Sequence, residues 1–212
     1  MRKLLRAALI LLPLQCVVFG QHWEVGVAGG YGFLRDVPVT AGTVSGTAGM
    51  APGMAAGALL GNQISRFVGG EVRYTYQADD LRVTAGSVTA KATAQTHAIH
   101  YDVLIHATNK DARVRPFLAA GAGVKLYRGT GTEPAYQPLS NLVLLTHTNE
   151  AKPLVSFGGG IKVSVSPRVL FRIDVRDYAT PVPSNLLATP PGSKMSGWMH
   201  DFVFLVGISS VF

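Results

Sequence analysis

Three side chains able to bind metals or transfer protons stand on one short alternating stretch: His100, Asp102 and His106. Imidazole and carboxylate groups supply both kinds of chemistry. In a strand the first two are neighbours on one face, whereas His106 lies about 13 Å beyond Asp102 at about 3.3 Å per residue. One ion cannot contact all three, so we expect no metal site. We expect instead a network of hydrogen bonds and ion pairs with Arg73, Lys125 or Arg172.

The composition is apolar and glycine-rich, with few charges. Hydrophobic residues make up 48% of the 212 residues, 24 are glycines and only 15% are charged, compared with about 25% in soluble domains. The net charge of +7 is not gathered in one lysine- and arginine-rich segment, which argues against a nucleic-acid partner. Beyond the N-terminal segment, no run reaches the roughly 20 apolar residues of a spanning helix. The remaining classes are a secreted β protein and a membrane β-barrel.

Residues 1–20, MRKLLRAALILLPLQCVVFG, predict a cleaved secretory signal peptide, which leaves residues 21–212 as a single domain. Three basic residues precede an apolar run over 7–19, as in export signals. Its removal would subtract those three charges from +7 and leave +4. The single cysteine, Cys16, lies in this segment behind Gln15, which is not the small residue that precedes a lipoprotein cysteine. We therefore expect neither a lipid anchor nor a disulfide.

Eight stretches alternate between apolar and small or polar residues, the period of a strand with two different faces. In the last of them, FVFLVGISSVF, the apolar set runs through Phe202, Phe204, Val206 and Ile208 to Phe212. The eight stretches are residues 23–33, 52–60, 67–77, 97–107, 115–128, 154–165, 169–178 and 202–212.

The connections between these stretches alternate in length. Tight polar turns are expected at 62–65, 109–112 and 166–168, and long segments rich in Thr, Ser, Gly and Pro at 34–50, 78–95, 129–149 and 179–198. Short turns at one end and long loops at the other are typical of outer-membrane barrels. The sequence therefore predicts an all-β, eight-stranded, antiparallel up-and-down transmembrane barrel, with both termini on the periplasmic, short-turn side.

The less apolar face of the strands carries opposite charges among glycines and other small residues. An eight-stranded barrel has an interior just wide enough for side chains to fill, so this face is expected to fill the lumen. The inverted arrangement, a soluble barrel or sandwich with its charges outside, stays open as an alternative. The expected lumenal residues are Glu71, Arg73, His100, Asp102, His106, Lys125, Lys162, Arg172, Asp174 and Arg176.

Four segments resemble the small outer-membrane β-barrel proteins of Gram-negative bacteria, the OmpA-like transmembrane-barrel superfamily. They are EVGVAGGYGF, RPFLAAGAGVKLY, GGGIKVSVSPRVLFRIDVRDY and HDFVFLVGISSVF. The resemblance extends over the predicted mature chain as a barrel alone, without the peptidoglycan-binding domain of the best-known members. It implies an integral outer-membrane location, contact with outer-membrane lipids and no cofactor, and we expect a monomer.

The resemblance also implies a role for the last strand in biogenesis. In such proteins a C-terminal strand ending in Phe is a signal for the barrel-assembly machinery. Phe202, Phe204, Val206, Ile208 and Phe212 carry that expectation here.

An enzyme is the alternative that the resemblance also raises, because some outer-membrane barrels remove or transfer lipid A acyl chains. His200 and Asp201 begin the last strand, but the deacylase pattern has a serine two residues after the histidine, where this chain has Phe202. Ser196 and Ser209 are not placed to replace it. We expect no catalytic residues and no enzyme activity.

Aromatic residues at strand ends, Trp23, Tyr178 and Trp198, are expected to anchor the barrel at the membrane interfaces. Residues 139–147, LSNLVLLTH, are unusually apolar for a loop and either extend a strand or fold over the barrel mouth. We predict a structural or surface-interaction role, with a narrow porin-like pore for small solutes or ions as the first alternative. The sequence does not identify an extracellular partner.

Overall fold

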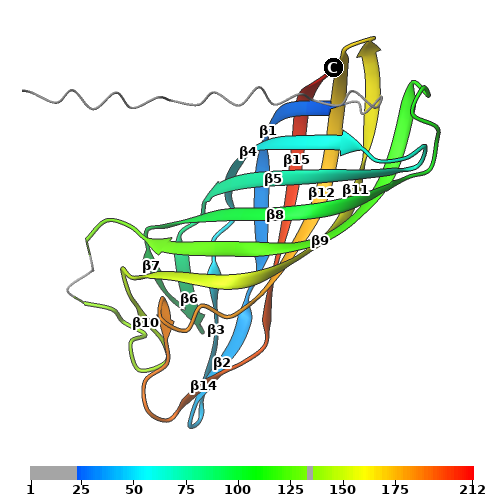
Figure 1. The fold of residues 1–212 in the computed structure, drawn as a ribbon. Helices are drawn as coiled ribbons and strands as arrows, with labels where there is room; N and C mark the ends of the chain where they lie inside the picture. The colour runs from blue at the N-terminus through cyan, green and yellow to red at the C-terminus, as the bar shows by residue number, and fades with distance from the viewer. Residues whose placement is uncertain (1–22, 133–135) are drawn as a thin grey trace, which may run out of the picture.

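The fold was obtained as a computed structural model, which describes residues 23–132 and 136–212. Eight antiparallel strands close into a barrel in the order β1-β15-β12-β11-β9-β8-β5-β4 (Figure 1). The predicted eight-stranded fold is confirmed. The predicted signal peptide, residues 1–20, lies outside the described residues. The barrel strands are β1 (Trp23–Arg35), β4 (Gly53–Gln63), β5 (Val68–Ala78), β8 (Ala94–His106), β9 (Val114–Gly129), β11 (Asn149–Ser166), β12 (Val169–Pro181) and β15 (Trp198–Val211).

The last strand closes the barrel against the first. Glu24 pairs with Val211 and Arg35 with His200, so the register continues along the whole of β1. Trp23 and Phe212 exchange two backbone hydrogen bonds, of 2.9 and 3.0 Å, at the short-turn end. Closure pairs the backbone N–H and C=O groups that the edge strands of an open sheet would leave exposed.

The apolar face of the strands points outward. Val27, Ile99 and Ile208 expose 60%, 56% and 54% of their surface. The carboxylates of Glu24 and Asp102, three residues from Val27 and from Ile99, are buried on the opposite face. In β15, Val203 and Leu205 are buried while Phe202 and Phe204 are exposed. This polarity is the reverse of that of a soluble barrel and matches the outer apolar band of membrane barrels. Among the described residues, no helix is long and apolar enough to cross a membrane.

The described residues of the long connections form further structure beyond the barrel, which we call the loop cap. Five short strands make a second sheet in the order β14-β2-β3-β6-β7, and β10 pairs with β13 (Figure 1). The loop cap comprises the described residues of the long connections, with the strands β2 (Val37–Ala41), β3 (Val44–Met50), β6 (Leu81–Ala85), β7 (Val88–Ala92), β10 (Leu144–Leu145), β13 (Leu187–Ala188) and β14 (Ser193–Met195).

Two hairpins of the loop cap use the same turn chemistry. Gly42 and Gly86 have φ of 58° and 57° and follow the last residues of β2 and β6, in the related sequences AGTV and AGSV. The residue after each glycine does not have a positive φ. A positive φ at the first loop position alone defines the type II′ turn, which favours glycine there and suits the twist of two-residue hairpins.

A hydrophobic core joins the loop cap to the barrel. Val39, Met50 and Leu81 from the second sheet pack with Leu142 and Leu187 from the other loops. Leu34, Tyr127 and Met199, near the loop ends of barrel strands, belong to the same cluster. Residues 139–147 do not extend a barrel strand, because Leu144–Leu145 form a separate short strand that pairs with β13. Leu139, Leu142, Val143 and Leu145 are buried in this core.

Candidate functional site in the charged lumen and at its mouth

Four carboxylates and three arginines form the centre of the lumen. Arg73 bonds Glu71 at 2.8 Å and Asp174 at 3.0 Å. Arg172 lies 2.7 Å from Glu24 and 2.8 Å from Glu71. The planar guanidinium group suits such multiple pairing because its five N–H donors point in fixed directions.

Arg176 is held less closely than the other two arginines. Its nearest carboxylate oxygens are those of Asp102 at 3.5 Å, Glu71 at 3.7 Å and Asp174 at 3.9 Å. Its guanidinium lies 5.5 Å from the ring centroid of the buried Phe117. Because a buried cation gains little from such long contacts, Arg176 is the member of the network with the most hydrogen-bonding capacity left over.

The two lumenal histidines have different surroundings. His100 bonds Asp102 at 3.0 Å and the Tyr178 hydroxyl at 3.1 Å, whereas His106 is buried without a hydrogen-bond partner for its ring nitrogens among the described residues. In the described part of the chain no group of three or more potential metal ligands comes together. The His100–Asp102 pair is thus part of the hydrogen-bond network.

A second polar group lies nearer the loop cap. Lys125 and Asp201 are 2.5 Å apart, and Gln77 donates to Asp201 at 3.2 Å. Asp79, directly after β5, is buried nearby, and neither of its carboxylate oxygens has a hydrogen-bond partner among the described residues. Burial raises the pKa of Asp79 to about 7, the carboxylates of Asp201 and Asp80 add to the rise, and Lys125 opposes it.

Glycines on neighbouring strands provide the space for these side chains. A Cβ atom at Gly121 would collide with Asp102, and one at Gly123 would collide with His100. The alternation of glycine with larger residues in β9 therefore lets β8 direct long polar side chains into the lumen. The glycine-rich pattern is a packing requirement of this interior.

Several members of the network were not singled out from the sequence. Glu24 bridges Lys162 and Arg172, and Phe117 lies within 6 Å of the cationic groups of Lys162, Arg172 and Arg176. Glu24 lies on the face of its strand that carries the small residues, opposite to the face of Trp23. The alternation of residue types along the strand therefore already indicates a lumenal position for Glu24. Its partners depend on the barrel register, which the sequence alone does not give.

The expectation for Tyr178 as an interfacial anchor is wrong. Its side chain is fully buried inside the barrel, where the hydroxyl contacts Thr75 and His100. Tyr178 lies on the same face of β12 as Arg172, Asp174 and Arg176. The alternation of faces along the strand therefore sets its position, and the preference of aromatic residues for membrane interfaces does not. Trp23 and Trp198 are exposed at opposite ends of the barrel wall.

His200 and Asp201 point to opposite sides of the barrel wall. His200 bonds Asp177 at 2.7 Å and is partly exposed, whereas Asp201 is buried against Lys125. In the described part of the chain His200 has no hydrogen bond to a serine or threonine. The two residues thus do not form a shared acid–base site.

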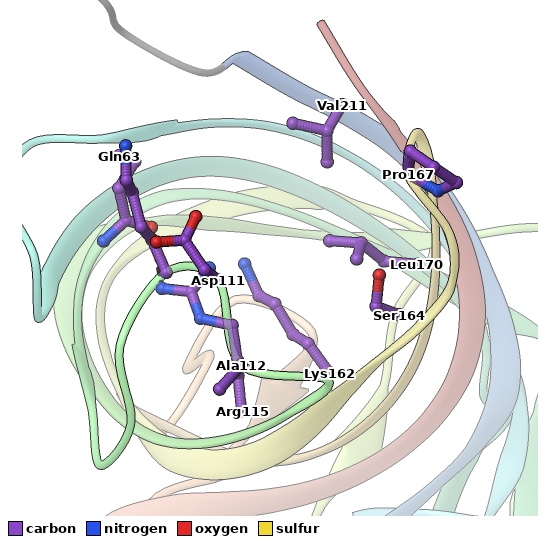
Figure 2. A pocket seen from close by; sticks show the side chains of 10 residues that line it. Gln63, Asp111, Ala112, Arg115, Lys162, Ser164, Pro167, Leu170 and Val211 are labelled. Carbon is purple, nitrogen blue, oxygen red and sulfur yellow. Dashed lines mark hydrogen bonds between the residues drawn. The ribbon is translucent and has the colours of Figure 1, made fainter.

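At the short-turn end the lumen opens into a hollow of about 290 Å³, which we call the mouth pocket. Figure 2 shows Asp111, Arg115 and Lys162 extending into it, with Gln63 at one side and Pro167 and Leu170 at the other. Arg115 donates to Gln63 at 2.9 Å, and Lys162 lies 2.5 Å from Glu24. Its polar lining residues are Gln63, Lys110, Asp111, Arg115, Lys162 and Ser164.

Comparison with solved structures identifies the fold class. Neisserial surface protein A superposes with a TM-score of 0.54 at 14% identity, covering 91% of this chain and 99% of that one. The N-terminal barrel of Pseudomonas aeruginosa OprF and the Yersinia pestis attachment invasion locus protein Ail each give 0.45, at 12% and 11% identity, covering 90% of this chain and 97% and 99% of theirs.

The superposition on Neisserial surface protein A shows that this chain has the fold of an eight-stranded outer-membrane barrel. No protein family and no curated protein sequence matches the chain. The fold is therefore established by structure, while sequence similarity adds nothing on function.

Proposed function

We propose that the protein is an integral outer-membrane barrel whose loop cap makes a structural or surface contact outside the cell and whose lumen is filled by its own side chains. The observation that carries this proposal is the combination of an exposed apolar wall with a buried network of ion pairs. Such a wall in water would be an apolar patch far larger than soluble monomers expose. In this orientation the short turns and both termini are periplasmic.

A filled lumen is supported by the pairing of its charges. Arg73 and Arg172 each contact two carboxylates within 3.0 Å, and both arginines are fully or almost fully buried. An ion moving through would have to break these pairs in a region of low dielectric, which is costly. The network thus favours a structural barrel over a conducting one.

The surface role is supported by the construction of the loop cap. Its sheet and its hydrophobic core give the loops fixed positions, and binding functions often reside on loops that a rigid scaffold positions. The fold neighbour at 14% identity is named a surface protein.

Conductance of the folded protein in a planar bilayer separates the filled lumen from the narrow pore. We expect no ohmic steps from the unmodified protein. Steps that disappear on neutralising Arg172 or Arg176 would show that ions pass along these residues and would contradict the filled lumen. Incubation with purified lipid A tests the enzyme alternative, and an unchanged lipid is the expected result.

A further inference from the structure

The short-turn end of the barrel concentrates basic side chains around the mouth pocket. Lys110 and Asp111 belong to the turn between β8 and β9, and Arg115 and Lys162 extend from β9 and β11. The exposed turn residues Arg66, Arg113 and Arg168 lie at the same end. The only acidic residue lining the pocket among the described residues is Asp111.

The buried cations of the pocket retain hydrogen-bonding capacity. Arg115 is 8% exposed and donates to Gln63, yet its Nε atom is buried without a partner among the described residues. Lys162 shares Glu24 with Arg172. A buried guanidinium N–H without an acceptor is unfavourable, so the hydrogen bonding of Arg115 is incomplete beside the pocket.

We propose that the mouth pocket binds a phosphate group. Several phosphate oxygens can accept from the Arg115 guanidinium, the Lys110 amine and the Lys162 amine together, and arginine and lysine are the usual phosphate-binding side chains. The hollow of about 290 Å³ opens to the solvent side and is closed inward by the Lys162–Glu24–Arg172 contacts. The ligand therefore binds at the mouth and does not pass through the barrel.

Asp111 acts as a competitor within the same hollow. Its carboxylate extends toward the side of the pocket occupied by Arg115 (Figure 2). A phosphate dianion carries more charge than this single carboxylate and displaces it outward on its exposed turn. Removing the charge of Asp111 should therefore strengthen binding, whereas removing that of Arg115 or Lys110 should weaken it.

The first experiment is a calorimetric titration at low ionic strength with inorganic phosphate and with glycerol 3-phosphate. The protein is folded in an amine-oxide detergent, which contains no phosphate. We expect saturable binding that R115Q and K110Q each weaken by at least about tenfold, the scale of one charge-assisted hydrogen bond. D111N should tighten it several-fold. R66Q, a matched loss of charge on a turn outside the pocket, should leave it unchanged.

The second experiment distinguishes a free phosphate from a lipid headgroup. The protein is inserted into phosphatidylcholine vesicles with and without phosphatidic acid, and its urea unfolding midpoint is measured. A midpoint raised by phosphatidic acid in the unmodified protein but not in R115Q assigns the site to a headgroup. Binding of the soluble phosphates without this rise assigns it to a free solute.

Two results would overturn the proposal. One is the absence of both soluble and lipid effects in the unmodified protein. The other is a loss in R66Q equal to that in R115Q, which would reduce the site to diffuse attraction by a basic surface. Because Arg115 is buried, heat-modifiable electrophoretic mobility checks that R115Q is folded. K110Q, on an exposed turn, provides the same test without altering the barrel interior.

Discussion

Replacing Asp79 by Asn should stabilise the folded barrel at neutral and alkaline pH and change little at pH 4. Asp79 is fully buried below the loop cap, and its oxygens have no hydrogen-bond partner among the described residues. Asparagine has nearly the shape of the carboxylic acid and carries no charge, so the substitution removes the cost of ionisation while keeping the packing.

The size of the effect follows from the raised pKa of Asp79, about 7 in the folded chain against an ordinary value of 3.8. The folded state holds this proton more tightly than the unfolded chain, so the free energy of unfolding falls as the pH rises from about 4 to about 7. At about 1.4 kcal/mol for each pH unit, the ionised carboxylate costs about 4 kcal/mol above pH 7. Below pH 4 both states are protonated and the contribution vanishes.

The assay is urea unfolding of both proteins in lipid vesicles between pH 4 and pH 9, followed by tryptophan fluorescence. Asp111→Asn is the control, because Asp111 is exposed on the turn between β8 and β9, at the opposite end of the barrel. Curves for the unmodified protein and Asp79→Asn that stay parallel across this range would refute the reasoning. A stabilisation that is largest at pH 4 would refute it as well.

Three further predictions concern other parts of the molecule. Glu71→Gln leaves Arg73 and Arg172 each with one fewer buried counter-charge and should lower the free energy of unfolding by about 3 kcal/mol, measured by urea titration with exposed Asp111→Asn as the reference. Leu142→Ala removes a fully buried side chain from the loop-cap core and should cost about 2–5 kcal/mol; faster protease cleavage in the loops with an intact barrel is expected, and unchanged cleavage would contradict a cooperative cap. Deleting Phe212 should reduce insertion in cells more than it reduces the stability of a barrel already folded, and equal losses in both measurements would oppose a role as an assembly signal.

The barrel was predictable because each of its strands carries a period-two pattern over nine or more residues. The alternation in stretches such as 169–178 sets both the strand and its outward face, and it placed Arg172 and Asp174 in the lumen. The same pattern placed Tyr178 inside. The expectation from residue type alone, a membrane-interface position, failed because an aromatic hydroxyl with two polar partners is stable in this interior.

The loop cap was not predictable to the same degree. Strands such as Val37–Ala41 and Leu81–Ala85 contain five residues each, so their alternation barely exceeds that of an ordinary loop. Their sheet also joins three different loops, and such pairing depends on the barrel bringing distant segments together. The apolar run at 139–147 was the one sequence signal of a core at this end.

The network partners required the barrel register in addition to the pattern. Glu24 and Lys162 are separated by 138 residues along the chain, and their contact follows from the closure of β1 against β15 and from the pairing of β12 with its neighbours. The residue types predicted a charged lumen, whereas the pairings within it could be known only from the folded barrel.

A nitroxide accessibility scan along β15 tests the central claim, a lipid-facing apolar wall around a closed lumen, most directly. Single cysteines replace residues 202–209 in turn, and the spin-labelled protein is studied in vesicles with oxygen and a water-soluble nickel complex as relaxation agents. We expect high oxygen and low nickel accessibility at Phe202, Phe204, Val206 and Ile208, and low accessibility to both agents at the alternate positions. Nickel accessibility at Phe204 and Val206 equal to that of the loop cap would show a water-facing wall and contradict the account.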